Sequence, residues 1–183
     1  HYFGHSVAET NDDLQALIAA AGEVGTPGIL VPLDNGDLFR FAEPYPDFDI
    51  EAVAEYGRQK GVRLIGHHET SGNVTNYARQ MDAAFDHYES AGVRQGKTGY
   101  VADGGNIKRV DENGVVRYEW HDGQFNVGEY LRSVTEAAER RISINTHEPI
   151  KDTGLRRTYP NWLSREGAKG QEFNAWGVPP KPA

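Results

Sequence analysis

Short apolar runs alternate along the chain with longer stretches whose apolar residues recur every three or four positions. The runs lie at residues 28–33, 62–68, 93–101 and 142–148, and they are typical of buried strands. The stretches between and before them, at 11–25, 49–61, 76–92 and 124–141, predict helices. A further short, weak helix is expected at 161–169. The order of these elements predicts a parallel sheet with helical crossovers.

Two of the predicted helices carry recognisable start signals, and two show a clear apolar face. Asn11 is a plausible N-cap for the first, and Asp49 for the second. The first helix should bury the apolar positions Leu14, Leu17, Ile18 and Ala21. The helix at 76–92 should contribute a core face made of Tyr77, Met81, Ala84, Phe85 and Tyr88.

The alternation of predicted strands and helices along the chain fits either a closed (β/α)₈ barrel or an open doubly wound sheet. About four or five strand–helix units are present, whereas a whole barrel needs about 250 residues. If the fold is a barrel, the chain is therefore a piece of one. One insertion, at 106–120, alternates apolar and polar residues around Asn113-Gly114, which predicts a hairpin with a type I′ turn. It follows the third strand, so it should project from the carboxyl end of the sheet.

Composition and charge exclude several classes of function. The chain has 183 residues, a net charge of −8 and a pI of about 5.3, which argues against a nucleic-acid partner. It has no cysteine, so neither disulfides nor thiolate metal sites are possible. No stretch is long and apolar enough to predict a membrane span. The chain begins at His1 rather than Met and shows no signal peptide, so we expect its natural start to lie elsewhere.

Polar side chains gather where three of the predicted strands end, and parallel folds place their sites at that edge. These side chains are His67, His68, Glu69, Lys97, Thr98, Asn145, His147 and Glu148. Three chemistries are open: a calcium site of oxygen ligands, a general acid and base for glycoside hydrolysis, and a transition-metal site. The chain carries no G-x-G-x-x-G and no G-x-S-x-G motif.

Several longer motifs resemble glycoside hydrolase family 97. They are "PYPDFDI", "GVRLIGHHETSG", "NYARQMDAAF", "KTGYV" and "NTHEPIKDTGLRRTYPN" followed by "SREGAKGQEFNAW". The resemblance implies a (β/α)₈ barrel with parallel strands, of which this chain is an internal part spanning residues 1–176. Residues 177–183 are expected to be a disordered tail. We expect two missing parts of the parent chain to pack against this chain as its partners. They are a β-sandwich and the last strands of the barrel.

The resemblance also implies roles for individual residues. Glu172 corresponds to the general acid, and Glu148 and Glu69 to the bases that position water in inverting members. Glu148 and Glu166 correspond to calcium (Ca²⁺) ligands. His67 and His147 are similar to residues that contact sugar hydroxyls, and Lys97 to a residue of the pocket floor.

The position that carries the nucleophile in retaining members is Gly99 here, which matches the inverting, α-glucosidase-like branch. Asp103 is a distant substitute for the missing carboxylate. The implied function is calcium-dependent cleavage of α-glucosidic, or α-galactosidic, bonds in an oligosaccharide substrate. Family analogy places the protein in the periplasm or outside the cell.

Other interpretations remain open at this point. The chain could be a carbohydrate- or calcium-binding relic, since the segment "LVPLDNGDLFRF" lacks the Glu and Trp expected there. It could also be a metal-dependent hydrolase with another substrate. Arg156 and Arg157 should pair with carboxylates, and Trp162 should pack rather than stack on sugar. His87 and His121 should be ordinary surface or hairpin residues. An isolated barrel segment with open strand edges is expected to fold poorly.

Overall fold

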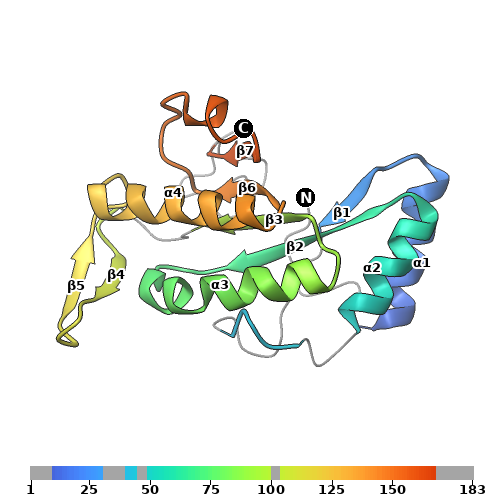
Figure 1. Ribbon diagram of the computed structural model, residues 1–183, viewed down its shortest axis with the longest axis horizontal. Coiled ribbons are helices and arrows are strands. Elements are labelled where there is room, and N and C mark those ends of the chain that lie inside the picture. The colour runs from blue at the N-terminus through green and yellow to red at the C-terminus, as the bar shows by residue number, and fades with distance from the viewer. Residues whose placement is uncertain (1–9, 31–39, 45–48, 100–103, 168–183) are drawn as a thin grey trace, which may run out of the picture.

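The computed structural model describes residues 10–30, 40–44, 49–99 and 104–167. Its centre is a five-stranded sheet in which every pairing is parallel (Figure 1). In spatial order the strands are β1 (Gly28–Leu30), β2 (Arg63–Glu69), β3 (Gln95–Gly99), β6 (Ser143–His147) and β7 (Trp162–Glu166). Strands that follow one another in the sequence are neighbours in this sheet, so the predicted parallel α/β arrangement is confirmed.

Four helices connect or precede these strands. They are α1 (Asn11–Glu23), α2 (Ile50–Lys60), α3 (Val74–Ser90) and α4 (Gln124–Glu139). Asp49 caps α2 as predicted, because its carboxylate accepts a hydrogen bond from the Ala52 amide at 3.0 Å. The cap of α1 is Thr10 and not Asn11, since the Thr10 hydroxyl accepts from the amide of Asp13.

The core lies between the helices and one face of the sheet. On α3 the predicted core face is confirmed, with Tyr77, Met81, Ala84, Phe85 and Tyr88 all fully buried. On α1 the side chains of Leu14, Ile18 and Ala21 are buried. Leu17 was expected beside them, but it is 45% exposed, because it lies on the side of α1 turned away from that apolar stripe.

The predicted hairpin is present between β3 and α4, as β4 (Ile107–Val110) paired antiparallel with β5 (Val116–Glu119). It lies beside the loop after β2, where the Lys108 amide donates to the carbonyl of Gly72 at 2.8 Å. The hairpin therefore stands at the carboxyl end of the sheet, as expected (Figure 1).

The turn of the hairpin is not the predicted type I′. That turn needs a positive φ at both Asn113 and Gly114, and only Gly114, at 78°, has one. The Gly114 amide instead donates to the Asp111 carbonyl, and the Asp111 amide donates to the carbonyl of Val115. The Asp111 side chain also accepts from the Asn113 and Val115 amides, each at 2.9 Å. Asp111 therefore stabilises a three-residue loop that ends in a left-handed glycine.

The predicted helix at 161–169 is wrong over its described part. Residues Trp162–Glu166 form strand β7, which follows a short 3₁₀ helix, η1 (Leu155–Arg157). Pairing with β6 decides the conformation here, because it satisfies the backbone of β7 and buries Trp162, which is 2% exposed. As a helix, these five residues would bury no comparable apolar face, and a helix this short is not stable by itself.

No helix in the described part of the chain is long and apolar enough to cross a membrane. Several expectations concern residues outside the described ranges. These are the segment 31–39, Asp103, Glu172 and the proposed tail at 177–183.

Packing between β2 and α3 leaves no room for a side chain at Gly66. A Cβ atom there would lie 2.3 Å from the buried ring of Tyr88. We expect Gly66→Ala to destabilise the protein by about 2–3 kcal/mol through overpacking. Its cross-strand partner Gly96 is a matched control, since a Cβ there would meet its nearest neighbours at 3.7 Å. Urea unfolding of both variants in the intact protein tests this, and equal losses would contradict it.

Candidate active site

The register of four strands gathers the predicted site residues on one face of the sheet. Glu69, Gly99, His147 and Glu166 lie opposite one another in β2, β3, β6 and β7. The row two residues earlier contains His67, Lys97, Asn145 and Ser164. Side chains alternate between the faces of a strand, so both rows lie on the same face, away from α3. Five of the predicted residues therefore share one surface: His67, Glu69, Lys97, His147 and Glu166.

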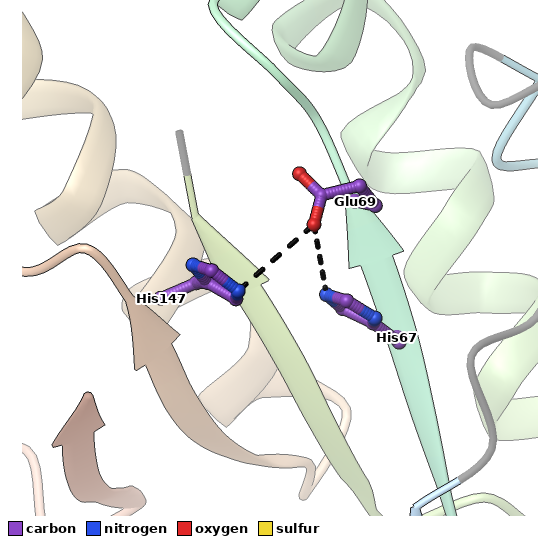
Figure 2. A group of neighbouring side chains, drawn as sticks. All are labelled: His67, Glu69 and His147. Atoms are coloured by element: carbon purple, nitrogen blue, oxygen red, sulfur yellow. Dashed lines mark ion pairs between the residues drawn. The ribbon is translucent and has the colours of Figure 1, made fainter. Parts of the chain in front are cut away.

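Glu69 lies between two histidines (Figure 2). One of its carboxylate oxygens, Oε2, is 3.5 Å from Nε2 of His67 and 4.0 Å from Nε2 of His147. The two imidazole rings are stacked, with centroids 5.8 Å apart and an angle of 7° between their planes. The three ligand atoms lie within 4.8 Å of one another, so they could bind a single ion or a single polar group together.

Burial keeps these histidines neutral. It lowers the pKa of His67 to about 3 and that of His147 to about 4, and the positive charge of Lys97 adds to both effects. Burial also raises the pKa of the Glu69 carboxyl, although hydrogen bonds from the backbone and the charge of Lys97 oppose it. Near neutral pH the cluster therefore offers imidazoles that can accept or donate one hydrogen bond each, beside a carboxylate that binds protons more readily than usual.

Lys97 and Glu166 form an ion pair at the base of this face. The Lys97 side chain is 1% exposed, and its Nζ contacts Oε2 of Glu166, which is itself 24% exposed. The same Glu166 oxygen lies 4.0 Å from Nε2 of His147. A buried ammonium group is costly without a partner, so Glu166 stabilises Lys97 in its charged form. The pair also links β3 to β7 across β6.

Glu148 follows β6 in a left-handed conformation, with φ at 38°. Its side chain pairs with Nδ1 of His147, and its backbone carbonyl accepts hydrogen bonds from two residues. The Tyr130 hydroxyl on α4 donates to it at 2.5 Å, and the ring of His121 contacts it as well. Nε2 of His121 also lies 3.0 Å from the Tyr130 hydroxyl. These contacts hold the end of β6 in a conformation that a non-glycine residue rarely adopts.

His121 was expected to be an ordinary surface or hairpin residue, and its contact with the end of β6 was missed. Sequence spacing gave no signal for it, because 27 positions separate His121 and Glu148. Tyr130 was missed for the same reason. Only the packing of α4 against β6 brings the two residues to the edge of the site.

His68 lies on the opposite face from the site, although it follows His67 directly. Its Nδ1 is 2.9 Å from the Tyr77 hydroxyl, and its ring stacks on that of Tyr88 at 4.4 Å. It is therefore a core residue that binds β2 to α3. Of the polar residues at the strand ends, Thr98 and Thr146 are also buried on this face.

Of the remaining residues with a predicted role, some are described by the structure and others are not. Arg156 pairs with Asp152 at 2.8 Å, and Trp162 is buried with its indole donating to Thr146 at 2.7 Å, so both act in packing as predicted. Glu172, the predicted general acid, lies outside the described residues, and so does Asp103.

Comparison with known proteins agrees with this arrangement of strands. The family described as Glycoside hydrolase 97 matches residues 5–168. A family 97 enzyme from Pseudoalteromonas sp. strain K8, solved with acarbose, is 59% identical, with a TM-score of 0.86 over 95% of this chain. A glutamate-to-glutamine variant of a family 97 enzyme from that strain, solved with panose, has the same identity, TM-score and coverage. A retaining alpha-galactosidase from Bacteroides thetaiotaomicron is 25% identical over 136 residues, or 73% of this chain.

The fold is part of a (β/α)₈ barrel whose strand ends carry a cluster of carboxylates, histidines and a lysine. The chain belongs to glycoside hydrolase family 97. It spans 28% of the two Pseudoalteromonas chains and 17% of the Bacteroides protein. A beta-arabinopyranosidase structure, 18% identical with a TM-score of 0.60, shares the fold alone.

The buried histidines predict a loss of stability in acid. Burial lowers the pKa of His68 to about 3 from its ordinary value of 6.5. Between these values the unfolded chain binds a proton at His68 and the folded chain does not. The free energy of unfolding therefore falls as the pH drops from about 6.5 toward 3, and His67 and His147 add to this fall.

We expect His68→Gln to reduce that dependence by about 1.4 kcal/mol per pH unit in the steep range, while lowering stability at neutral pH. Urea unfolding of the intact protein and of the variant at a series of pH values between those limits measures the two slopes. An unchanged slope in the variant would show that His68 is protonated in the folded protein.

Proposed function

We propose that this chain forms part of the active site of a calcium-dependent glycoside hydrolase that cleaves α-glucosidic bonds with inversion. The observation that carries the proposal is the shared face of β2, β3, β6 and β7. It combines Glu69 with the neutral imidazoles of His67 and His147 and with the Lys97–Glu166 pair. Carboxylates, hydrogen-bonding imidazoles and a fixed cation are the groups that bind sugar hydroxyls and move protons during glycoside hydrolysis.

The expected substrate is an α-glucoside in an oligosaccharide. The Pseudoalteromonas enzymes, 59% identical to this chain, were solved with acarbose and with panose, whereas the alpha-galactosidase is 25% identical. Acarbose and panose both contain α-linked glucose-type units. The greater identity therefore favours the α-glucoside over the α-galactoside.

Each site residue has a role in this proposal. Glu172 is the general acid that protonates the leaving oxygen, and Glu69 or Glu148 is the base that removes a proton from the attacking water. The raised pKa of Glu69 supports its role, because a base close to the working pH accepts a proton more effectively. His67, His147 and Lys97 bind sugar hydroxyls and fix the position of the ring.

The surroundings of Gly99 support direct attack by water. A Cβ atom at this position would lie 2.1 Å from the backbone oxygen of His147, which cannot move without disrupting β6. This backbone arrangement therefore excludes a carboxylate side chain at the place where a retaining enzyme of the family would carry its nucleophile. With no nucleophile at position 99, we expect water to attack the sugar directly and the product to have the opposite anomeric configuration.

Glu148 and Glu166 are the proposed calcium ligands. Their carboxylates offer the oxygen donors that calcium prefers, and they lie at the ends of adjacent strands, β6 and β7. Each is held by a neighbour, Glu148 by His147 and Glu166 by Lys97, and a carboxylate can keep such a contact through one oxygen while ligating through the other. Bound calcium would offset the repulsion among the carboxylates of the site. Calcium takes six to eight oxygen ligands, so these two carboxylates would form only part of its shell.

Proton NMR of the intact protein acting on aryl α-glucoside tests this function. We expect hydrolysis that a calcium chelator abolishes and added calcium restores, with the β-anomer of glucose as the first product. Aryl α-galactoside should be hydrolysed more slowly. First appearance of the α-anomer would refute the role of Gly99, and absence of hydrolysis in the calcium-loaded protein would leave the carbohydrate-binding relic as the better interpretation.

The general acid can be tested by the dependence on the leaving group. We expect Glu172→Gln to reduce kcat/KM on maltose-type substrates, whose leaving groups need protonation, by about 10²–10⁴-fold. An aryl glucoside with an acidic phenol should lose much less, because its leaving group departs as an anion. Equal losses on both substrates would argue that Glu172 acts in some other way.

A further inference from the structure

We propose that His67, Glu69 and His147 form a binding site for a transition-metal ion of the zinc class, distinct from the calcium ligands Glu148 and Glu166. In the part of the chain that the structure describes, these are the three side chains whose ligand atoms come together closely enough to hold one ion. They provide two imidazole nitrogens and one carboxylate oxygen. Zinc commonly binds this set of donors, and it leaves a fourth position open.

The ligand atoms all lie within 4.8 Å of one another, and the two separations that involve Glu69 approach those of a tetrahedral zinc site. Bonds of about 2.0–2.2 Å in tetrahedral geometry place neighbouring donor atoms about 3.3–3.6 Å apart. Nε2 of His67 is already 3.5 Å from Oε2 of Glu69. Nε2 of His147 is 4.0 Å from the same oxygen, so this contact must shorten by roughly half an ångström, within the reach of a rotation of the Glu69 side chain.

The environment of His147 favours a metal on its Nε2 atom. The Glu148 carboxylate pairs with Nδ1 on the other side of the ring. A proton on Nδ1, facing this carboxylate, would leave the lone pair of Nε2 directed toward Glu69, as in the carboxylate–histidine–zinc arrangement of known metal sites. Glu148 would therefore orient a zinc ligand through the same side chain that is proposed to bind calcium.

His67 provides the second observation that points to a ligand. Its side chain is 10% exposed, and its Nε2 atom is buried with no hydrogen-bond partner among the described residues. A buried ring nitrogen aimed at a carboxylate, without a hydrogen bond to satisfy it, is suited to a cation or a bound hydroxyl.

The charges around the cluster permit a divalent ion. Lys97 is a cation whose charge acts on His67 and His147, and this charge is compensated by the ion pair with Glu166. Glu69 then contributes a negative charge of its own. Two nitrogen donors distinguish this cluster from a calcium site, because calcium prefers oxygen ligands and binds imidazole poorly.

A metal at this place would inhibit the enzyme. This consequence rests on the proposed function, since His67 and His147 are expected to bind the sugar and Glu69 to act as a base. An ion bound to all three residues would occupy the position of a sugar hydroxyl or of the attacking water. Zinc should then compete with the substrate, raising KM with little change in kcat at saturating substrate.

The binding test uses the intact, calcium-loaded protein and does not depend on activity. We expect one zinc ion to bind per chain in a calorimetric titration, and excess calcium not to displace it. Cobalt(II) should give the intense visible absorption of a four-coordinate ion with nitrogen ligands. His67→Gln and His147→Gln should each weaken zinc binding by at least about 100-fold. His87→Gln, which removes a histidine of α3, is the matched control and should bind zinc with unchanged affinity.

Three results would overturn the proposal. They are zinc binding that survives both ligand variants, displacement of zinc by calcium, and loss of binding in His87→Gln as well. Circular dichroism shows whether each variant is folded, and Glu69→Gln provides a third, nearly isosteric test if a histidine variant is not. Zinc binding without glycosidase activity would uphold the metal site and refute the proposed function, whereas activity without zinc binding would do the reverse.

Discussion

Parallel pairing of β2, β3, β6 and β7 in a fixed register is the constraint on which the site depends. Four strands contribute Glu69, Gly99, His147 and Glu166 to a single row, and no other register would place them together. A slip of one residue in any strand would turn its site residue toward the helices. The register is secured from the opposite face, where Gly66 lies against Tyr88 and His68 contacts Tyr77.

Strand β7 keeps this row only because its pairing with β6 is irregular. Trp162 lies opposite Ile144, but Ser164 lies opposite Asn145, so Leu163 is an extra residue between the two pairs. In a regular strand Trp162 and Glu166 would point to the same face. The extra residue lets Trp162 pack in the core with its indole bonded to Thr146, while Glu166 reaches Lys97 on the other face.

The sequence predicted the parallel sheet, the four helices and three of the four strands that carry the site, because apolar periodicity reports directly on which faces are buried. It predicted His67, Glu69, Lys97 and His147 from their position at the strand ends. It failed at β7, where five residues adopt a strand because a neighbouring strand is available. It also failed to separate His68 from His67, and it missed Tyr130 and His121, because such contacts depend on packing between elements distant in sequence.

The same burial that positions the site also determines its chemistry. His67 and His147 lie deep enough in the sheet face to remain neutral, so they cannot serve as cations toward a substrate or toward Glu69. The fixed positive charge must therefore come from Lys97, which is buried and in turn requires Glu166. Glu69 lies between the two imidazoles and has no direct ion pair with a permanent cation among the described residues. A proton, a water molecule or a metal ion in contact with the Nε2 atoms of both histidines would also contact Glu69, so acid–base chemistry and metal binding are both proposed at this residue.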